Sequence, residues 1–145
     1  MRFGYNTNGF AHHRLEDYLD ILADLGYRSI ALTLDFHCLL PDDPVSKIEA
    51  VGARLARHGL RVVIETGARF VLDPRRKHQP TLLDPDPAMR SIRSRFLERS
   101  AEVGRALGAD AVSFWSGAPV SDEPQGVLMT RLADECRHLA DHAAG

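Results

Sequence analysis

The chain has 145 residues, 44 % of them hydrophobic, which is enough for one core and too few for two domains of typical size. A formal net charge of −2 gives no general attraction to nucleic acids, and no apolar run approaches the length of a membrane span. Two cysteines without metal-type spacing, and no signal-peptide pattern, predict a reduced, cytoplasmic protein that binds neither nucleic acid nor membrane.

The first half of the chain alternates between strand and helix patterns. Residues 2–6 predict a short strand, and apolar residues at helical spacing predict a helix over 15–25. A second strand is expected over 29–34. Asp43 as N-cap and Pro44 in the first turn then indicate the start of a second helix. The buried residues expected on these two helices are Leu15, Tyr18, Leu19, Leu22 and Leu25, then Ile48, Val51 and Leu55.

The third unit contains a long connection. Val62, Val63 and Ile64 predict a short, entirely β-branched strand, which is typical of a parallel sheet buried on both faces. The connection over residues 66–87 holds four prolines and is longer than most loops of compact domains. Loops of this length are often functional, so we expect this one to contribute to a site.

A fourth strand lies between the last two helices. Asp86 and Pro87 predict the N-terminus of the third helix. The fourth strand is expected over 110–115, and the fourth helix begins near Glu123 and Pro124. The residues expected to be buried on these helices are Met89, Ile92, Phe96, Val103 and Leu107, then Leu128, Leu132 and Leu139.

Each helix pattern ends at a glycine, namely Gly26, Gly59, Gly108 and Gly145. Glycine commonly ends a helix because it adopts left-handed backbone conformations without strain. A strand pattern follows the first three glycines, and we expect the repeat to be cut before a fifth strand. The alternation predicts an α/β fold with a parallel sheet in a single domain over residues 1–145. Two architectures fit: an open, doubly wound sheet, or a (β/α)4 unit that is half of a TIM barrel.

Repeating β/α folds carry their chemistry at the carboxyl ends of the strands. His37 follows the second strand and is a candidate catalytic acid or base, or else a loop histidine bonded to backbone. Glu65 ends the third strand as a candidate catalytic carboxylate, or as a structural partner of Arg69. Trp115 ends the fourth strand, where its indole would form an apolar wall, stack on a sugar face, or pack at the rim. Asn6 would hydrogen-bond a polyol or only shape a turn.

The long connection carries the densest positive cluster in the chain. It comprises Arg75, Arg76, Lys77 and His78, with Arg69 nearby. Guanidinium and ammonium groups bind phosphate and carboxylate well, so Arg75, Arg76 and Lys77 are candidate substrate-binding residues. The alternative is a solvated surface loop.

The fourth unit resembles the xylose isomerase-like barrels, a group that also contains sugar-phosphate isomerases, epimerases and endonuclease IV-type enzymes. The resemblance rests on residues 100–110, which end in a Leu-Gly-Ala turn, and on Trp115 and Gly117 after the next strand. The Phe36-His37 pair is similar to a Phe-His pair of xylose isomerases. The resemblance implies that Trp115 lines the sugar pocket and that His37 assists ring opening. Trp115 stands where an endonuclease IV-type enzyme is expected to carry histidine, which disfavours DNA repair.

The resemblance also implies a function. We expect the N-terminal half of a sugar, sugar-phosphate or polyol isomerase or epimerase whose parent uses a divalent metal: Mn, Mg, Co or Zn. The metal ligands of the family lie on later strands, so this chain is expected to hold no metal and to be nearly inactive. The alternatives are a non-catalytic, self-associating half-barrel and a complete small open-sheet domain that binds an anion. Open strand edges near residues 3–5 and 112–114, and exposed apolar sheet faces, predict a homodimer or higher assembly.

Overall fold

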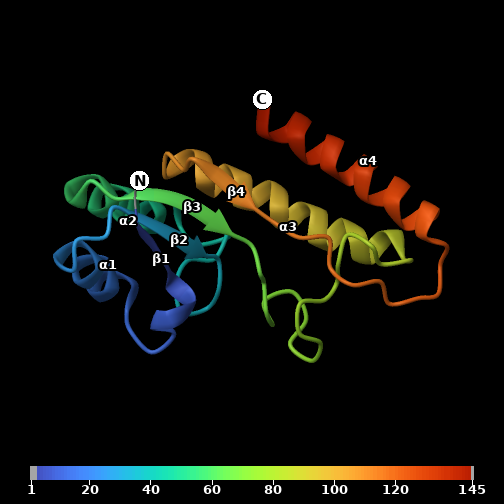
Figure 1. Ribbon diagram of the computed structural model, residues 1–145, viewed down its shortest axis with the longest axis horizontal. Helices are drawn as coiled ribbons and strands as arrows, with labels where there is room; N and C mark the ends of the chain where they lie inside the picture. The colour runs from blue at the N-terminus through green and yellow to red at the C-terminus, as the bar shows by residue number, and fades with distance from the viewer. Residues whose placement is uncertain (1–2, 145) are drawn as a thin grey trace.

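The computed structural model describes residues 3–144, which form four parallel strands and four α-helices in alternation (Figure 1). Arg2 in the first predicted strand and Gly145 after the fourth helix lie outside the described residues. The strands are β1 (Gly4–Asn6), β2 (Ser29–Thr33), β3 (Arg61–Glu65) and β4 (Ala111–Ser113). The helices are the 3-10 turn η1 (Thr7–Phe10), α1 (Leu15–Asp24), α2 (Val45–His58), α3 (Pro87–Ala106) and α4 (Gln125–Ala144).

The strand order distinguishes the two predicted architectures. The strands lie in the order β1-β2-β3-β4, and each pair of neighbours is parallel. The register places Asn6 beside Ala31, Ala31 beside Val63, and Val63 beside Ala111. A doubly wound sheet reverses its direction of winding, so its strand order does not follow the sequence. The sequential order therefore identifies a singly wound (β/α)4 unit, which is half of a TIM barrel.

One face of the sheet carries the core. The buried strand residues on this face are Ile30, Leu32, Val62 and Ile64. They pack in one cluster with buried side chains of α1, α2 and α3, so three helices cover the same face. The predicted helix residues that are buried there are Leu15, Tyr18, Leu19, Leu22, Ile48, Val51, Leu55, Phe96, Val103 and Leu107.

The opposite face of the sheet is open, and small or polar residues predominate on it. Cross-strand neighbours point to the same face, so the register defines its members. The residues of this face that are at least partly exposed are the following: Gly4, Asn6, Ser29, Ala31, Arg61, Val63, Glu65, Ala111 and Ser113. The prediction of a sheet buried on both faces is wrong for residues 3–144, because every crossover helix lies on the other side. The predicted apolar exposure holds on this face only for Ala31, Val63 and Ala111.

The helix boundaries follow local sequence signals closely. The Asp86 carboxylate accepts the backbone N–H of Ala88 at 2.9 Å and caps α3, as predicted. Helix α2 begins one residue later than predicted: Pro44 is its N-cap, and Asp43 precedes it and accepts the N–H of Leu40 at 2.8 Å. The predicted helix-ending glycines Gly26, Gly59 and Gly108 have φ angles of 84°, 62° and 63°.

Burial predictions are wrong on three helices. Met89 and Ile92 of α3 are only half-buried. Leu25 caps the end of α1 and is 69 % exposed. Helix α4 has no fully buried residue, because α3 is its main neighbour and it lies on the outside of the fold (Figure 1). The three leucines expected in its buried stripe are therefore only half-buried: Leu128, Leu132 and Leu139. None of the helices in residues 3–144, α4 included, combines the length and apolarity needed to cross a membrane.

Candidate functional site

The carboxyl ends of the four strands meet at one edge of the open face, and the loops after the strands surround it (Figure 1). Asn6 ends β1, Glu65 ends β3, and Trp115 follows β4. His37 lies in the loop after β2. The structure therefore brings the four predicted strand-end residues to the same edge of the sheet. This edge is where β/α barrels place their catalytic and binding groups.

Hydrogen bonds fix the turn after β1. The Asn6 Oδ1 atom accepts the backbone N–H of Asn8 at 2.9 Å and lies 3.3 Å from the Thr33 hydroxyl, which donates to it. The buried Thr7 hydroxyl accepts the backbone N–H of Thr33 at 2.9 Å. Asn6 therefore shapes the turn and ties β1 to the end of β2. Its contact with a polyol stays a prediction.

His37 lies in a tight loop after β2. The N–H of Asp35 donates to the Leu39 carbonyl at 3.0 Å, and the N–H of Cys38 donates to the Asp35 carbonyl at 2.9 Å. The buried Asp35 carboxylate accepts the N–H of Phe36 at 2.7 Å. The His37 Nε2 atom is buried and has no hydrogen-bond partner within residues 3–144. The loop thus buries an imidazole nitrogen that has no hydrogen-bond partner among the described residues.

The long loop over residues 66–86 folds back against the strand ends. The Thr66 hydroxyl donates to the Ser113 carbonyl at 2.8 Å and joins this loop to β4. Arg93 of α3 is 2 % exposed and donates from Nη2 to the Thr66 carbonyl at 2.8 Å. Burial lowers the pKa of Arg93 to about 10. Residues 80–84 of the loop are buried, so the loop is a packed wall of the site.

His78 is a site residue that the sequence pattern did not distinguish from the positive cluster. Its Nδ1 atom lies 2.7 Å from the Gly67 carbonyl oxygen. Its ring lies edge-on to the Trp115 indole, with ring centroids 5.1 Å apart and an interplanar angle of 80°. Trp115 is 43 % exposed and so keeps much of its surface open. No short-range sequence signal predicts this pairing, because it depends on how the long loop folds back.

The three predicted cations lie elsewhere in the same loop. Arg75, Arg76 and Lys77 are all exposed. The Asp73 carboxylate accepts the backbone N–H groups of Arg75 and Arg76 at 2.8 and 3.1 Å, and the Nε–H of Arg76 at 2.7 Å. These bonds lower the pKa of Asp73. The Arg76 charge is therefore already paired, and anion binding by the cluster stays a prediction.

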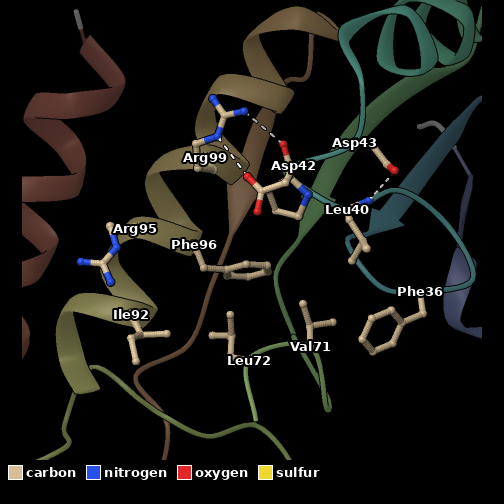
Figure 2. Close-up of a pocket in the computed structure, with 11 residues that line it drawn as sticks. Phe36, Leu40, Asp42, Asp43, Val71, Leu72, Ile92, Arg95, Phe96 and Arg99 are labelled. Carbon is tan, nitrogen blue, oxygen red and sulfur yellow. Dashed lines mark hydrogen bonds and ion pairs between the residues drawn. The ribbon is translucent and has the colours of Figure 1, made fainter. Parts of the chain in front are cut away.

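A groove of about 490 Å³ lies beside the strand ends, between the loop after β2, the long loop and α3 (Figure 2). Figure 2 shows Arg99 at its rim, where its Nε atom lies 3.7 Å from the Asp42 carboxylate. Its lining also includes Phe36, Leu40, Val71, Leu72, Ile92 and Phe96. None of the four strand-end residues lines this groove, so it is separate from the strand-end site.

Buried polar atoms without a partner gather around the strand ends. Within residues 3–144, Asn8 Oδ1, His37 Nε2 and Gln79 Oε1 follow β1, β2 and β3, and Arg93 Nη1 lies near the start of α3. Leaving such an atom unsatisfied costs about 1–3 kcal/mol, and most buried polar groups in folded proteins are paired. His142 in α4 is the fifth such residue among those described. Four of the five therefore lie on segments that follow the strands or at the start of α3.

The sequence and the fold agree on the family. Residues 19–145 match the sequence profile of the xylose isomerase-like TIM barrel family, so the chain belongs to that family. A search of the curated proteins gives no match.

Three solved structures are similar in fold. D-psicose 3-epimerase in the presence of D-fructose superposes with a TM-score of 0.76 at 15 % identity, and the match covers 99 % of this chain and 49 % of that one. The Clostridium cellulolyticum D-psicose 3-epimerase with D-tagatose superposes with a TM-score of 0.75 at 16 % identity. That match covers 99 % of this chain and 49 % of the epimerase. The Escherichia coli 3-keto-D-glucoside 4-epimerase superposes with a TM-score of 0.71 at 18 % identity. That match covers 99 % of this chain and 52 % of the epimerase. The chain thus spans about half the length of these proteins.

The resemblance implied a divalent metal for the parent enzyme. In the part of the chain that the structure describes, no group of three His, Cys, Asp or Glu side chains is placed to hold a metal ion. A catalytic metal site needs about three protein ligands around an open position. The described residues therefore do not fit a metal centre by themselves, and the chemistry proposed below uses none of them as a ligand.

Proposed function

We propose that this chain forms the first half of a sugar isomerase or epimerase barrel, and that its strand-end edge faces the sugar. The observation that carries the proposal is the set of unpaired buried polar atoms on the segments that follow β1, β2 and β3, namely Asn8 Oδ1, His37 Nε2 and Gln79 Oε1. Membership of the xylose isomerase-like family supports the same class of reaction. A polyhydroxylated ligand would supply the hydrogen bonds that these atoms lack.

A ketose is the substrate class that fits best. The similar structures include epimerases solved with D-fructose and D-tagatose, and an epimerase of a 3-keto-glucoside. The half-exposed Trp115 offers an apolar surface to the C–H face of a sugar ring. Carboxylate, amide and imidazole groups at the same edge match the hydroxyl groups of such a ring.

The proposed chemistry is proton transfer at a carbon beside the carbonyl group. Glu65 lies on the open face at the end of β3 and is the proposed acid or base. His37 is proposed to exchange a proton with a ring hydroxyl and so assist ring opening. The other groups that the reaction needs, including metal ligands, are proposed to come from outside the described residues. The chain alone is therefore proposed to bind a ketose with little or no turnover.

An amide-resolved NMR titration of the chain with D-tagatose tests this proposal. We expect shifts at residues 6–8, 35–38 and 65–67, and at the Trp115 indole N–H. The Glu65→Gln variant should alter the shifts at the strand ends. The matched control Glu49→Gln changes an exposed residue of α2 and should leave them unchanged. No shifts at millimolar ketose, or shifts confined to the groove of Figure 2, would refute the proposal.

A second candidate role is self-association, which the strand edges and an apolar cavity favour. Strands β1 and β4 lie at the two edges of the described sheet. An apolar cavity of about 310 Å³ lies between β4, α3 and α4, and Phe3 beside β1 is 66 % exposed. The larger residues that line the cavity are Leu97, Val112, Phe114, Cys136 and Leu139. Two copies joined from β4 to β1 at both edges would form an eight-stranded barrel without open edges.

A further inference from the structure

His78 lies against Trp115, and the proposed chemistry leaves it without a role. We propose that His78 is a substrate-binding residue: its Nε2 atom accepts a hydrogen bond from a hydroxyl group of a sugar stacked on Trp115. This inference rests on the proposed function and specifies which residue anchors the sugar against the indole. The observation behind it is the edge-on contact of the two rings, with centroids 5.1 Å apart.

The hydrogen bond at Nδ1 determines the chemistry of Nε2. The Gly67 carbonyl oxygen, 2.7 Å from His78 Nδ1, can only accept, so Nδ1 carries a proton. In the neutral ring, Nε2 is then an acceptor. The hydrogen bonds within residues 3–144 include none to this atom, and it is absent from the buried unpaired atoms, so it is open to solvent. His78 therefore presents a fixed acceptor beside the indole.

The backbone holds this acceptor in place. His78 has a φ of 64°, and its backbone N–H donates to the Arg69 carbonyl. Ala68 in the same loop has a φ of 45°, and these are the two non-glycine residues with positive φ in residues 3–144. Such conformations are uncommon and cluster at binding sites, where the surrounding structure maintains them. A rigid acceptor loses little conformational entropy when a ligand binds.

The ligand group that fits this pair is an uncharged hydroxyl. An acceptor nitrogen repels an anion, and the neighbouring cations Arg75, Arg76 and Lys77 are exposed rather than packed against Trp115. An aromatic surface with one adjacent acceptor is complementary to a sugar ring that presents C–H groups and an O–H donor. The subsite therefore favours a neutral part of the sugar.

Trp115 provides the test because it is the only tryptophan in the chain. Its fluorescence is recorded while D-tagatose is added to the intact chain and to two variants. His78→Asn keeps an amide donor for Gly67 and tolerates positive φ, but it removes the acceptor at the Nε2 position. His78→Gln places an amide oxygen near that position. His12→Asn, in the exposed turn before α1, is the matched control.

We expect His78→Asn to raise the dissociation constant for D-tagatose about 3- to 10-fold, as the loss of one neutral hydrogen bond predicts. His78→Gln and His12→Asn should stay within about twofold of the original chain. Equal affinity in the original chain and His78→Asn would overturn the inference and leave the proposed function intact. A chain in which neither the fluorescence nor the NMR spectrum responds to ketose would overturn both.

A measurement on the unmodified chain keeps the test independent of variant folding. The ¹⁵N chemical shift of the His78 Nε2 atom distinguishes a free acceptor nitrogen from a hydrogen-bonded one. We expect this resonance to move upfield on addition of D-tagatose, while that of His12 does not. A response of the Asn6 and Glu65 amides without movement of the His78 resonance would mean that the sugar binds without His78.

Discussion

A Cβ atom added to Gly117 would lie 2.3 Å from the Cγ2 atom of Thr81, so only glycine fits where the loop after β4 crosses the long loop. Gly117 also has a φ of 83°, which L-amino acids with a side chain rarely adopt. Thr81 is buried, and its hydroxyl accepts the N–H of Leu83 at 3.2 Å. The crossing fixes the two loops that carry Trp115 and His78.

The substitution Gly117→Ala tests this crossing. It should destabilise the chain by about 1–3 kcal/mol, because it adds both a steric clash and an unfavourable φ. Gly67→Ala is the matched control in the long loop, since a Cβ there meets nothing within 4 Å. Urea unfolding measures both effects. Equal stability of the two variants would contradict the account of the loop crossing.

Glu123 gives the chain a defined response to acid. Hydrogen bonds from Arg131 and from the Ser121 hydroxyl lower the pKa of Glu123 to about 2, from a usual value of 4.5. Arg131 also donates to the Leu83 carbonyl at 2.9 Å and so links α4 to the long loop. Because the folded pKa lies below the unfolded one, the contribution of Glu123 to stability is present above about pH 4.5. It is lost as the pH falls towards 2.

Glu123→Gln should therefore lower stability near neutral pH, and the difference from the original chain should shrink between pH 4.5 and 2. Urea unfolding at several pH values gives this difference directly. Glu49→Gln, an exposed change in α2, should leave the slope unaltered. A Glu123→Gln difference that stays constant over this range would show that the pair with Arg131 does not contribute in this way.

The positive cluster of the long loop is expected to bind a charged substrate. Replacing Arg75, Arg76 and Lys77 together with alanine should weaken binding of D-fructose 6-phosphate about 3- to 10-fold. Binding of D-fructose, which has no phosphate, should not change. In a complete barrel enzyme the same change should raise KM more than it lowers kcat, because it removes uniform binding. Unchanged affinity for both sugars would show that the cluster is only a solvated surface.

The open edges predict self-association at micromolar concentration. Light scattering should give a dimer or higher assembly for the original chain, because unpaired strand edges favour further pairing. Phe114→Lys places a charge in the apolar cavity beside β4 and should shift the chain towards monomer. Phe36→Lys changes an exposed aromatic residue near the other groove and is the control. A monomeric original chain with dispersed amide signals would exclude this assembly.

The sequence predicts the elements of this fold well because their signals are local. Gly26, Gly59 and Gly108 end helices because glycine adopts positive φ angles without strain. Asp86 caps α3 by accepting the N–H of Ala88, two residues along the chain. Each such signal acts within about one helical turn, so it needs no knowledge of the tertiary structure. The alternation of strand and helix then limits the topology to parallel crossovers.

The burial of a side chain and the contact between His78 and Trp115 depend on distant parts of the chain, so local sequence patterns do not predict them. Periodicity identifies the apolar side of α4, but it does not show that α3 is its main neighbour, so Leu132 and Leu139 are less buried than predicted. Val63 matches a buried strand residue in type, yet it lies on the open face. Asn6, His37, Glu65 and Trp115 were predictable as strand-end residues. His78 was not, because a loop of irregular backbone brings it to Trp115.

The strand-end edge of this chain is proposed to bind a sugar. A crystal structure of the chain with D-tagatose tests it most directly. We expect a sugar ring stacked on Trp115, with one hydroxyl within hydrogen-bond distance of His78 Nε2 and others near Asn8 and His37. A sugar bound in the groove between Phe36 and Arg99, with the strand ends unoccupied at saturating ketose, would contradict it.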